Sequence, residues 1–185
     1  MTGAAQCGDC QRQPPSFAHT ICALDYAFPW DRLITHFKFH AMVELAKPLS
    51  NILLGAVLAS TRARPDLLIP VPLSDARLAE RGFNQAWEVT RRLGTSLGIP
   101  VSSRGITRVL DTPQQAQLTR AQRLANLRAA FVVPAAQQAQ LRGRHLALID
   151  DVLTTGATAE EATQALLRAG AASVALWVLA RTPAQ

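Results

Sequence analysis

Two adjacent carboxylates follow a short apolar run in a setting that fits a sugar phosphate. Residues 146–149 are apolar, Asp150 and Asp151 come next, and a turn of Thr and Gly at 154–158 leads into a helical pattern. A buried strand presents its chemistry at its C-terminal end, where open α/β sheets bind ligands. The turn offers hydroxyls and N–H groups at a helix N-terminus, which bind anions. A sugar phosphate with Mg²⁺ satisfies both parts, because its diol and the metal-bound waters face the acids while its phosphate faces the turn.

The hydrophobic spacing predicts strands and helices that alternate along the chain and position this run. Short apolar segments indicate strands at 20–26, 67–73, 99–101, 131–133, 146–149 and 173–179. Apolar residues at helical spacing indicate helices at 31–37, 42–60, 85–97 and 159–167. Strands that alternate with helices predict an α/β fold, with a mainly parallel central sheet and helices on both of its faces.

Length and composition are those of one globular domain. The chain has 185 residues, of which 49% are hydrophobic and 17% charged, so it can bury a substantial core. The sequence contains no uninterrupted apolar stretch of about eighteen residues, and no membrane insertion is expected. The first residues lack the charged and apolar regions of a signal peptide. We therefore expect a cytoplasmic protein.

The positive charge favours anionic partners. The net charge is +6, and Lys38 and Lys47 are the only lysines, so nearly all the positive charge is arginine. Arginine suits bidentate contacts to phosphate, although a bias of this kind along a whole chain also arises from genome composition. The partner could be nucleic acid or a polyphosphate substrate. Charge alone does not identify a DNA-binding protein.

The thirteen residues 146–158 closely resemble the signature with which type I phosphoribosyltransferases bind phosphoribosyl pyrophosphate (PRPP). The match covers every position: four hydrophobic residues, two acids, two hydrophobic residues and then Thr-Thr-Gly-x-Thr. A second motif resembles the ComF-type branch of that family, which is associated with competence and DNA uptake in bacteria; it consists of Val71-Pro72-Leu73, Arg77 and Arg81-Gly82-Phe83-Asn84-Gln85-Ala86. The resemblance covers about residues 16–182 and implies the type I phosphoribosyltransferase fold for residues 17–185.

The resemblance implies roles for the residues of the first motif. Asp150 and Asp151 match the catalytic acidic pair that engages the ribose hydroxyls and, through water, Mg²⁺. The loop that would hold the 5′-phosphate consists of Thr154, Thr155, Gly156, Ala157 and Thr158. Gly156 permits close approach of the backbone, and the hydroxyls complete the shell of donors around the phosphate.

The resemblance also implies a pyrophosphate site and a mobile loop. The pyrophosphate loop, which often carries a cis peptide in the family, corresponds to Val71, Pro72, Leu73 and Ser74, with Arg77 and Arg81 as cations for the leaving group. The polar segment 110–127 is the expected mobile loop, and Arg108, Arg120 and Arg123 flank it. Closure of such a loop over PRPP would exclude water.

Two departures from well-known family members limit what can be said of the acceptor. Purine-salvage enzymes carry an Asp at the position of Thr154, and that Asp accepts a proton from the purine; a threonine cannot. Orotate-type enzymes use lysines near the pyrophosphate site and the mobile loop, whereas this chain has no lysine after Lys47. Neither activity transfers, so the acceptor base is not named.

Residues 1–16 are either a tail or part of a zinc module. ComF-type proteins commonly begin with two Cys-x-x-Cys pairs, but here only Cys7 and Cys10 form such a pair. Adding His19 and Cys22 would give a formal set of four zinc ligands. Alternatively, Cys7 and Cys10 hold no metal and Cys22 is a small core residue of the first strand. Disulfides are not expected in the cytoplasm.

Three functions fit these observations. The first is an enzyme that binds PRPP and Mg²⁺ and transfers the phosphoribosyl group to an unidentified nitrogen acceptor. The second is a regulator that binds PRPP or a nucleotide without turnover. The third is an accessory factor in DNA uptake that contacts single-stranded DNA or a helicase of the competence machinery, although aromatic residues are not spaced through a basic segment as a stacking platform requires. Each could act as an oligomer.

Overall fold

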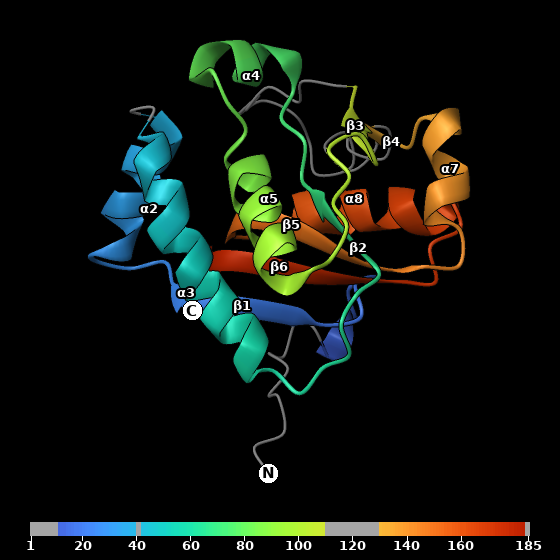
Figure 1. Cartoon of the computed structure of the whole chain (residues 1–185), viewed down its shortest axis with the longest axis horizontal. Helices are drawn as coiled ribbons and strands as arrows, with labels where there is room; N and C mark the ends of the chain where they lie inside the picture. Colours follow the sequence, from blue (N-terminus) through green and yellow to red (C-terminus); the bar gives the residue numbers. More distant parts are fainter. Residues whose placement is uncertain (1–10, 40–41, 110–129, 184–185) are drawn as a thin grey trace.

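A four-stranded parallel sheet forms the centre of the molecule (Figure 1). The computed structural model describes residues 11–39, 42–109 and 130–183. The order of the strands across the sheet is β1 (Thr20–Asp25), β6 (Ser173–Arg181), β5 (His145–Leu153) and β2 (Leu67–Pro70). Each neighbouring pair is parallel, which confirms the predicted sheet.

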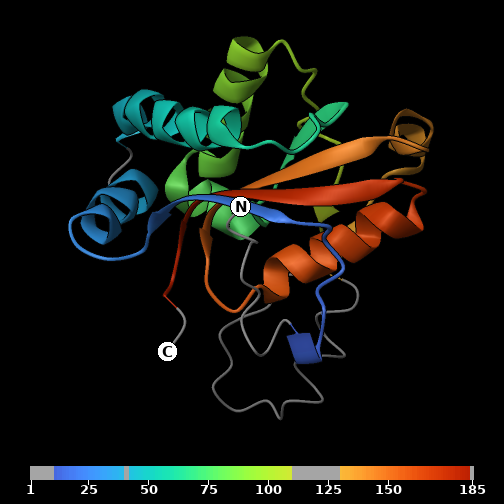
Figure 2. The ribbon, with the colours of Figure 1, turned by 90° about the horizontal axis from the view of Figure 1, so that it is seen from below.

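Helices cover both faces of this sheet, as the sequence predicts. In Figure 2, α3 (Ala46–Ala59) and α5 (Gln85–Leu97) lie on one side of the strands and α8 (Ala157–Arg168) lies on the other. Each face has its own apolar core: one contains buried residues of α3 and α5, and the other contains buried residues of α8. Within the described ranges, no helix is long and apolar enough to cross a bilayer.

Side chains of β5 contribute to both apolar cores. Leu146 and Leu148 pack in the core on the α8 face, while Ala147 and Ile149 pack in the core on the α3 and α5 face, as the alternation of a strand requires. This order changes beyond the acids, because Val152 packs against the α3 and α5 core and Leu153 against the α8 core. Asp151 contacts Lys38, whose neighbour Phe37 packs in the α3 and α5 core, so Asp151 lies on that face.

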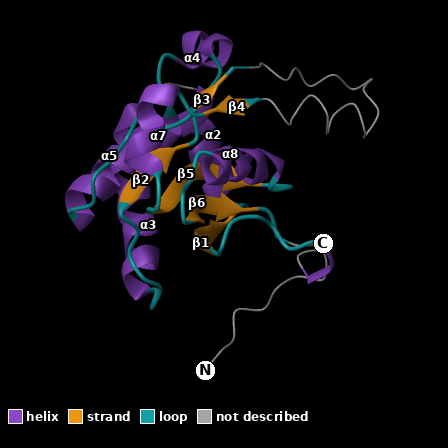
Figure 3. Ribbon diagram, turned by 90° about the vertical axis from the view of Figure 1, so that its right-hand side faces the viewer, coloured by secondary structure: helices purple, strands orange, loops and turns teal. Residues whose placement is uncertain are grey.

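Two of the predicted strands pair differently from the rest. In the segment 99–101, only Val101 pairs with the sheet, next to Leu68; Pro100 has no N–H to extend the ladder. The segment 131–133 does not join the main sheet. Instead β4 (Phe131–Val132) pairs antiparallel with β3 (Thr107–Arg108), and this small sheet lies at the same end of the molecule as α4 (Asp75–Arg81) (Figure 3).

The remaining helices differ from the predictions at their boundaries. The segment expected at 42–60 begins as the 3-10 turn η1 (Val43–Leu45) and continues as α3. Pro48 lies in the first turn of α3 and has no N–H for the carbonyl four residues earlier, which accounts for the tighter start. The helix expected at 31–37 is α2 (Trp30–Phe39). Two short helices, α4 and α7 (Ala135–Leu141), were not predicted.

Candidate functional site

The fold brings the three predicted parts of the site to one edge of the sheet. β2 and β5 are parallel neighbours, so the loops that follow them leave from the same edge. The Val71 N–H donates to the Ile149 carbonyl at 2.8 Å, which holds the start of the 71–74 loop beside the acidic pair. The turn 154–158 follows directly after β5. Ligands of open α/β sheets bind at this edge.

The turn 154–158 forms an exposed N-terminus for α8. Gly156 is the N-cap and adopts the left-handed conformation, with φ of +78°. The Thr155 hydroxyl accepts a hydrogen bond from the Ala157 N–H at 3.4 Å. Thr154, Thr155 and Ala157 are exposed. The free N–H groups and hydroxyls of this turn are suited to a phosphate group.

Asp150 and Asp151 differ in their surroundings. Asp151 is 8% exposed, and Asp150 is half-buried. The Asp150 carboxylate accepts from the Asp151 N–H at 2.9 Å, and the Asp151 carboxylate accepts from the Val152 N–H at 2.6 Å. Burial, followed by the neighbouring Asp151 carboxylate, raises the pKa of Asp150 to about 7, although Lys38 and Arg108 act in the opposite direction. Asp150 therefore holds a proton in a substantial fraction of molecules near neutral pH.

Lys38 is a member of the site that the sequence analysis did not assign. Its Nζ lies 2.9 Å from Asp151 Oδ1, and the side chains of Lys38 and Asp151 are 18% and 11% exposed. Lys38 comes from the end of α2, more than a hundred residues earlier in the chain. The feature of the sequence that could have pointed to Lys38 is its residue type, because it is one of two lysines in a chain that otherwise uses arginine.

The run Arg81-Gly82-Phe83-Asn84-Gln85 holds the end of α2 in place. The buried Gln85 side chain donates to the Lys38 carbonyl at 3.2 Å and accepts from Arg81 at 3.2 Å. The Arg81 guanidinium lies 4.8 Å from the centroid of the Phe39 ring. The rings of Phe37 and Phe83 lie 5.6 Å apart. This set of contacts fixes the backbone on both sides of Lys38.

The 71–74 loop is held by side chains from the helices that follow it. Asn84 donates to the Val71 carbonyl at 3.0 Å and also caps α5 by accepting from the Trp87 N–H at 3.3 Å. Ser74 caps α4 by accepting from the Arg77 N–H at 3.4 Å. The family's common cis peptide is not found here: among the described residues the cis bond is Phe28–Pro29, outside this loop.

The predicted cations of the pyrophosphate site lie on α4. Arg77 and Arg81 are both half-buried. Arg81 and Gln85 together hold the end of α2, and we call this pair the clamp. The Nε of Arg81 is buried with no hydrogen-bond partner among the described residues. Neither arginine forms an ion pair with Asp150 or Asp151 in the part of the chain that is described. The structure links Arg81 to the acidic pair through Gln85 and Lys38.

Arg108 is the predicted loop arginine that the structure describes. It lies on β3 with its guanidinium 5.5 Å from the centroid of the Phe131 ring. Its charge acts to lower the pKa of Asp150 and that of Glu161 on α8. Burial nevertheless raises the pKa of Glu161 to about 7, so this acid is a second feature that sequence reasoning missed. Arg120, Arg123 and the segment 110–127 lie outside the described residues.

The N-terminal segment is anchored to α8. The Ser16 N–H donates to Glu160 Oε2 at 2.8 Å, and the Ser16 hydroxyl donates to Glu160 Oε1. Cys22 packs against the core on the α8 face and donates its thiol hydrogen to the Leu24 carbonyl at 3.2 Å. Burial, and next the charge of Arg62 beyond α3, lower the pKa of His19.

His19 directly precedes β1, and Cys22 lies within that strand. Cys7 and Cys10 lie outside the described residues, and zinc binding by this pair stays a prediction.

The described residues offer an acidic pair rather than a complete metal cage. They contain no cluster of three or more His, Cys, Asp or Glu side chains that could hold a metal. The acidic pair supplies hard oxygen donors, and Mg²⁺ commonly binds through one or two carboxylates, waters and phosphate oxygens of the substrate. The residues present therefore fit a magnesium ion that arrives with a phosphorylated sugar.

The parallel sheet, with the acidic pair and the 154–158 turn at its edge, has the arrangement of the type I phosphoribosyltransferase fold. Residues 43–185 match the family model for the phosphoribosyl transferase domain. The chain belongs to this family.

Relatives with established names identify the branch. The chain is 39% identical to the DNA utilization protein YhgH of Escherichia coli O157:H7, an alignment that covers 95% of this chain and 78% of that protein. It is 35% identical to competence protein F of Haemophilus influenzae, over 96% of this chain and 79% of that protein. The chain is thus a member of the ComF-type branch.

Among solved structures, the glutamine PRPP amidotransferase of B. subtilis, complexed with ADP and GMP, matches with a TM-score of 0.49. That match is at 17% identity and covers 72% of this chain and 26% of that chain.

Proposed function

We propose that the protein binds PRPP with Mg²⁺ and transfers its phosphoribosyl group to a nitrogen acceptor. The observation that carries this proposal is the arrangement at one sheet edge: the acidic pair, the exposed N-terminus of α8 and the 71–74 loop are neighbours there. Each part suits one portion of PRPP, namely the ribose diol, the 5′-phosphate and the pyrophosphate.

The acidic pair and the turn would position the sugar. Carboxylates accept hydrogen bonds from ribose hydroxyls, and Asp151 is paired with Lys38 at 2.9 Å. The 5′-phosphate would accept hydrogen bonds from the N–H groups and hydroxyls of 154–158. When bound, Mg²⁺ would neutralise negative charge on the diphosphate.

In the proposed reaction, the bond between the anomeric carbon and the pyrophosphate oxygen breaks, and the electron pair leaves with pyrophosphate. The lone pair of the acceptor nitrogen forms the new bond on the opposite side, and the nitrogen loses a proton to solvent water. The protein contributes geometry and stabilisation of the leaving charge rather than a covalent intermediate. Thr154 cannot take the proton, which disfavours a 6-oxopurine acceptor.

A non-catalytic role is the second candidate. The names of the relatives, DNA utilization protein and competence protein F, connect those proteins to DNA. A protein of this branch could bind PRPP or a nucleotide as a signal, or act in DNA uptake in the cytoplasm beside a helicase or single-stranded DNA. The lack of a proton acceptor at Thr154 is the observation that favours this candidate.

Calorimetry with PRPP, with and without Mg²⁺, tests the proposal. The wild type should bind PRPP, and the double variant Asp150→Asn, Asp151→Asn should bind at least about tenfold more weakly in Mg²⁺. Release of pyrophosphate with any base of a panel would support the enzyme, whereas tight binding without turnover would favour the regulator. DNA binding that survives in the double variant, together with no PRPP binding by the wild type, would overturn both the enzyme and the PRPP-binding regulator and would favour the role in DNA uptake.

A further inference from the structure

The fold holds the Lys38 side chain against the acidic pair, so Lys38 is not a surface lysine that meets Asp151 by chance. Its side chain is 18% exposed and forms an ion pair with Asp151 at 2.9 Å. Ordering and desolvating a long cationic side chain has a free-energy cost, and a partly buried ion pair regains little of it on its own. The clamp made by Gln85 and Arg81 nevertheless fixes the backbone at this position.

The surroundings of Lys38 point to the pyrophosphate loop. Gln85, which binds the Lys38 carbonyl, directly follows Asn84, which binds the Val71 carbonyl. One short run of residues therefore holds both Lys38 and the start of the 71–74 loop. The Lys38 ammonium itself contacts Asp151, two residues beyond Ile149, and the Ile149 carbonyl binds the Val71 N–H at the start of that loop.

The face of the sheet separates Lys38 from the turn for the 5′-phosphate. Asp151 and its partner Lys38 belong to the α3 and α5 face of β5, whereas α8 and its N-terminal turn belong to the opposite face. Ribose hydroxyls are the partners of carboxylates, while an ammonium group prefers an anion. Of the three portions of PRPP, the diphosphate is the one that matches the place and the charge of Lys38.

We propose that Lys38 is a substrate-binding residue for the diphosphate of PRPP. Its ammonium pairs with Asp151 in the absence of substrate and donates to diphosphate oxygens when PRPP is bound. Negative charge on these oxygens grows as pyrophosphate departs, so a fixed cation also stabilises the leaving group. This inference rests on the proposed function, since it requires that PRPP binds at this edge.

The test compares three ligands by calorimetry in Mg²⁺: PRPP, inorganic pyrophosphate and ribose 5-phosphate, which lacks the diphosphate. Lys38→Gln should lower the affinities for PRPP and pyrophosphate by about tenfold or more, while the affinity for ribose 5-phosphate should change by less than about threefold. Lys38→Arg should retain most of the affinity for pyrophosphate. Lys47→Gln is the matched control, because it removes the same charge from an exposed position on α3 and should leave all three affinities unchanged.

The outcomes separate this inference from the proposed function. If the wild type binds PRPP and Lys38→Gln binds it equally well, the assignment of Lys38 is wrong and the proposed function stands. Equal losses for PRPP and ribose 5-phosphate would also overturn the assignment, because Lys38 would then act through the acidic pair. A wild type that binds no PRPP overturns both. If Lys38→Gln does not fold by circular dichroism, Lys38→Met, which keeps a long apolar side chain without charge, takes its place.

Discussion

At the scale of single residues, the neighbouring acids in one strand have different surroundings. Asp151 forms an ion pair with Lys38, whereas burial, followed by the Asp151 carboxylate, raises the pKa of Asp150 to about 7. An ionised pair so close together would repel strongly. Asp151 is therefore paired with a cation. Asp150 is ready to lose its proton when a ligand or Mg²⁺ binds.

The raised pKa of Asp150 predicts that its removal stabilises the free protein. The folded state has a higher pKa than the unfolded chain, so ionisation of Asp150 costs stability; this cost is complete above about pH 7 and vanishes as the pH falls below the unfolded pKa. Asp150→Asn should therefore raise the free energy of unfolding by about 1–2 kcal/mol at pH 8 in metal-free buffer. Denaturant unfolding at pH 4 and pH 8 measures the difference.

The matched control for this change is Asp25→Asn at the exposed end of β1. It should alter stability by less than about 0.5 kcal/mol at either pH. Equal stability of Asp150→Asn and the wild type at pH 8 would contradict the raised pKa. A stabilisation that is as large at pH 4 as at pH 8 would show that the effect comes from packing and not from charge.

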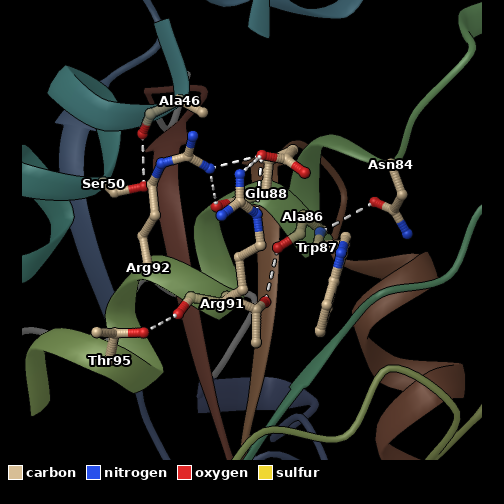
Figure 4. A network of polar contacts seen from close by, with 10 residues as sticks. Ala46, Ser50, Asn84, Ala86, Trp87, Glu88, Arg91, Arg92 and Thr95 are labelled. Carbon is tan, nitrogen blue, oxygen red and sulfur yellow. Dashed lines mark hydrogen bonds and ion pairs between the residues drawn. The ribbon is translucent and has the colours of Figure 1, made fainter. Parts of the chain in front are cut away.

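At the scale of elements, α5 carries both Gln85 of the clamp and an ion-pair network. Glu88 binds Arg91 at 2.6 Å and also Arg92, three and four residues further along the helix (Figure 4). Burial acts to raise the pKa of Glu88, but hydrogen bonds from Arg91 and Arg92 outweigh it and hold the pKa below its ordinary value. The ionised carboxylate thus stabilises α5, the helix whose first residue is Gln85.

Glu88→Gln should lower the free energy of unfolding by about 1 kcal/mol at pH 7. Because the folded pKa is depressed, the contribution is present above the unfolded pKa and disappears as the pH falls through the folded pKa. Thermal unfolding at pH 7 should show a decrease in Tm of about 2–4 °C. Glu44→Gln at an exposed position in η1 serves as the control, and an equal decrease for both variants would refute the role of the network.

The two hydrogen bonds of Gln85 predict one effect on stability and a second effect on ligand affinity. Gln85→Ala removes two hydrogen bonds of a buried side chain and should reduce the free energy of unfolding by about 1–3 kcal/mol. It should also lower the affinity for PRPP several-fold more than the affinity for ribose 5-phosphate, because the backbone of Lys38 is no longer held in place. Calorimetry with both ligands checks this, and an equal change for the two would mean that the clamp serves stability alone.

Local patterns predicted most of the elements, but not the contacts between them. The long segment α5 carries a clear hydrophobic period, and β6 is an uninterrupted apolar run; both signals depend only on near neighbours. The short helix α7 buries only Leu141, so its sequence has no period to detect. Lys38 was missed for another reason: its partner Asp151 is over a hundred residues away, and only the folded sheet brings them together.

At the scale of the whole molecule, ligand binding should couple to the stability of both apolar cores, since β5 contributes to each. A ligand at one hundred times its dissociation constant adds about 2.7 kcal/mol, or about 5–10 °C in Tm for a chain of this size. PRPP with Mg²⁺ should give such a shift in differential scanning fluorimetry. EDTA should abolish most of it, and a shift that persists in the Asp150→Asn, Asp151→Asn variant would contradict binding at this edge.

The link between Ser16 and Glu160 joins the chain that leads into β1 to the first turn of α8, across 144 residues of sequence. That turn of α8 begins directly at Gly156, inside the 154–158 turn. A ligand that orders the 154–158 turn would therefore also order the helix end to which Ser16 is bound. Binding at the turn and attachment of the segment before β1 would then stabilise each other.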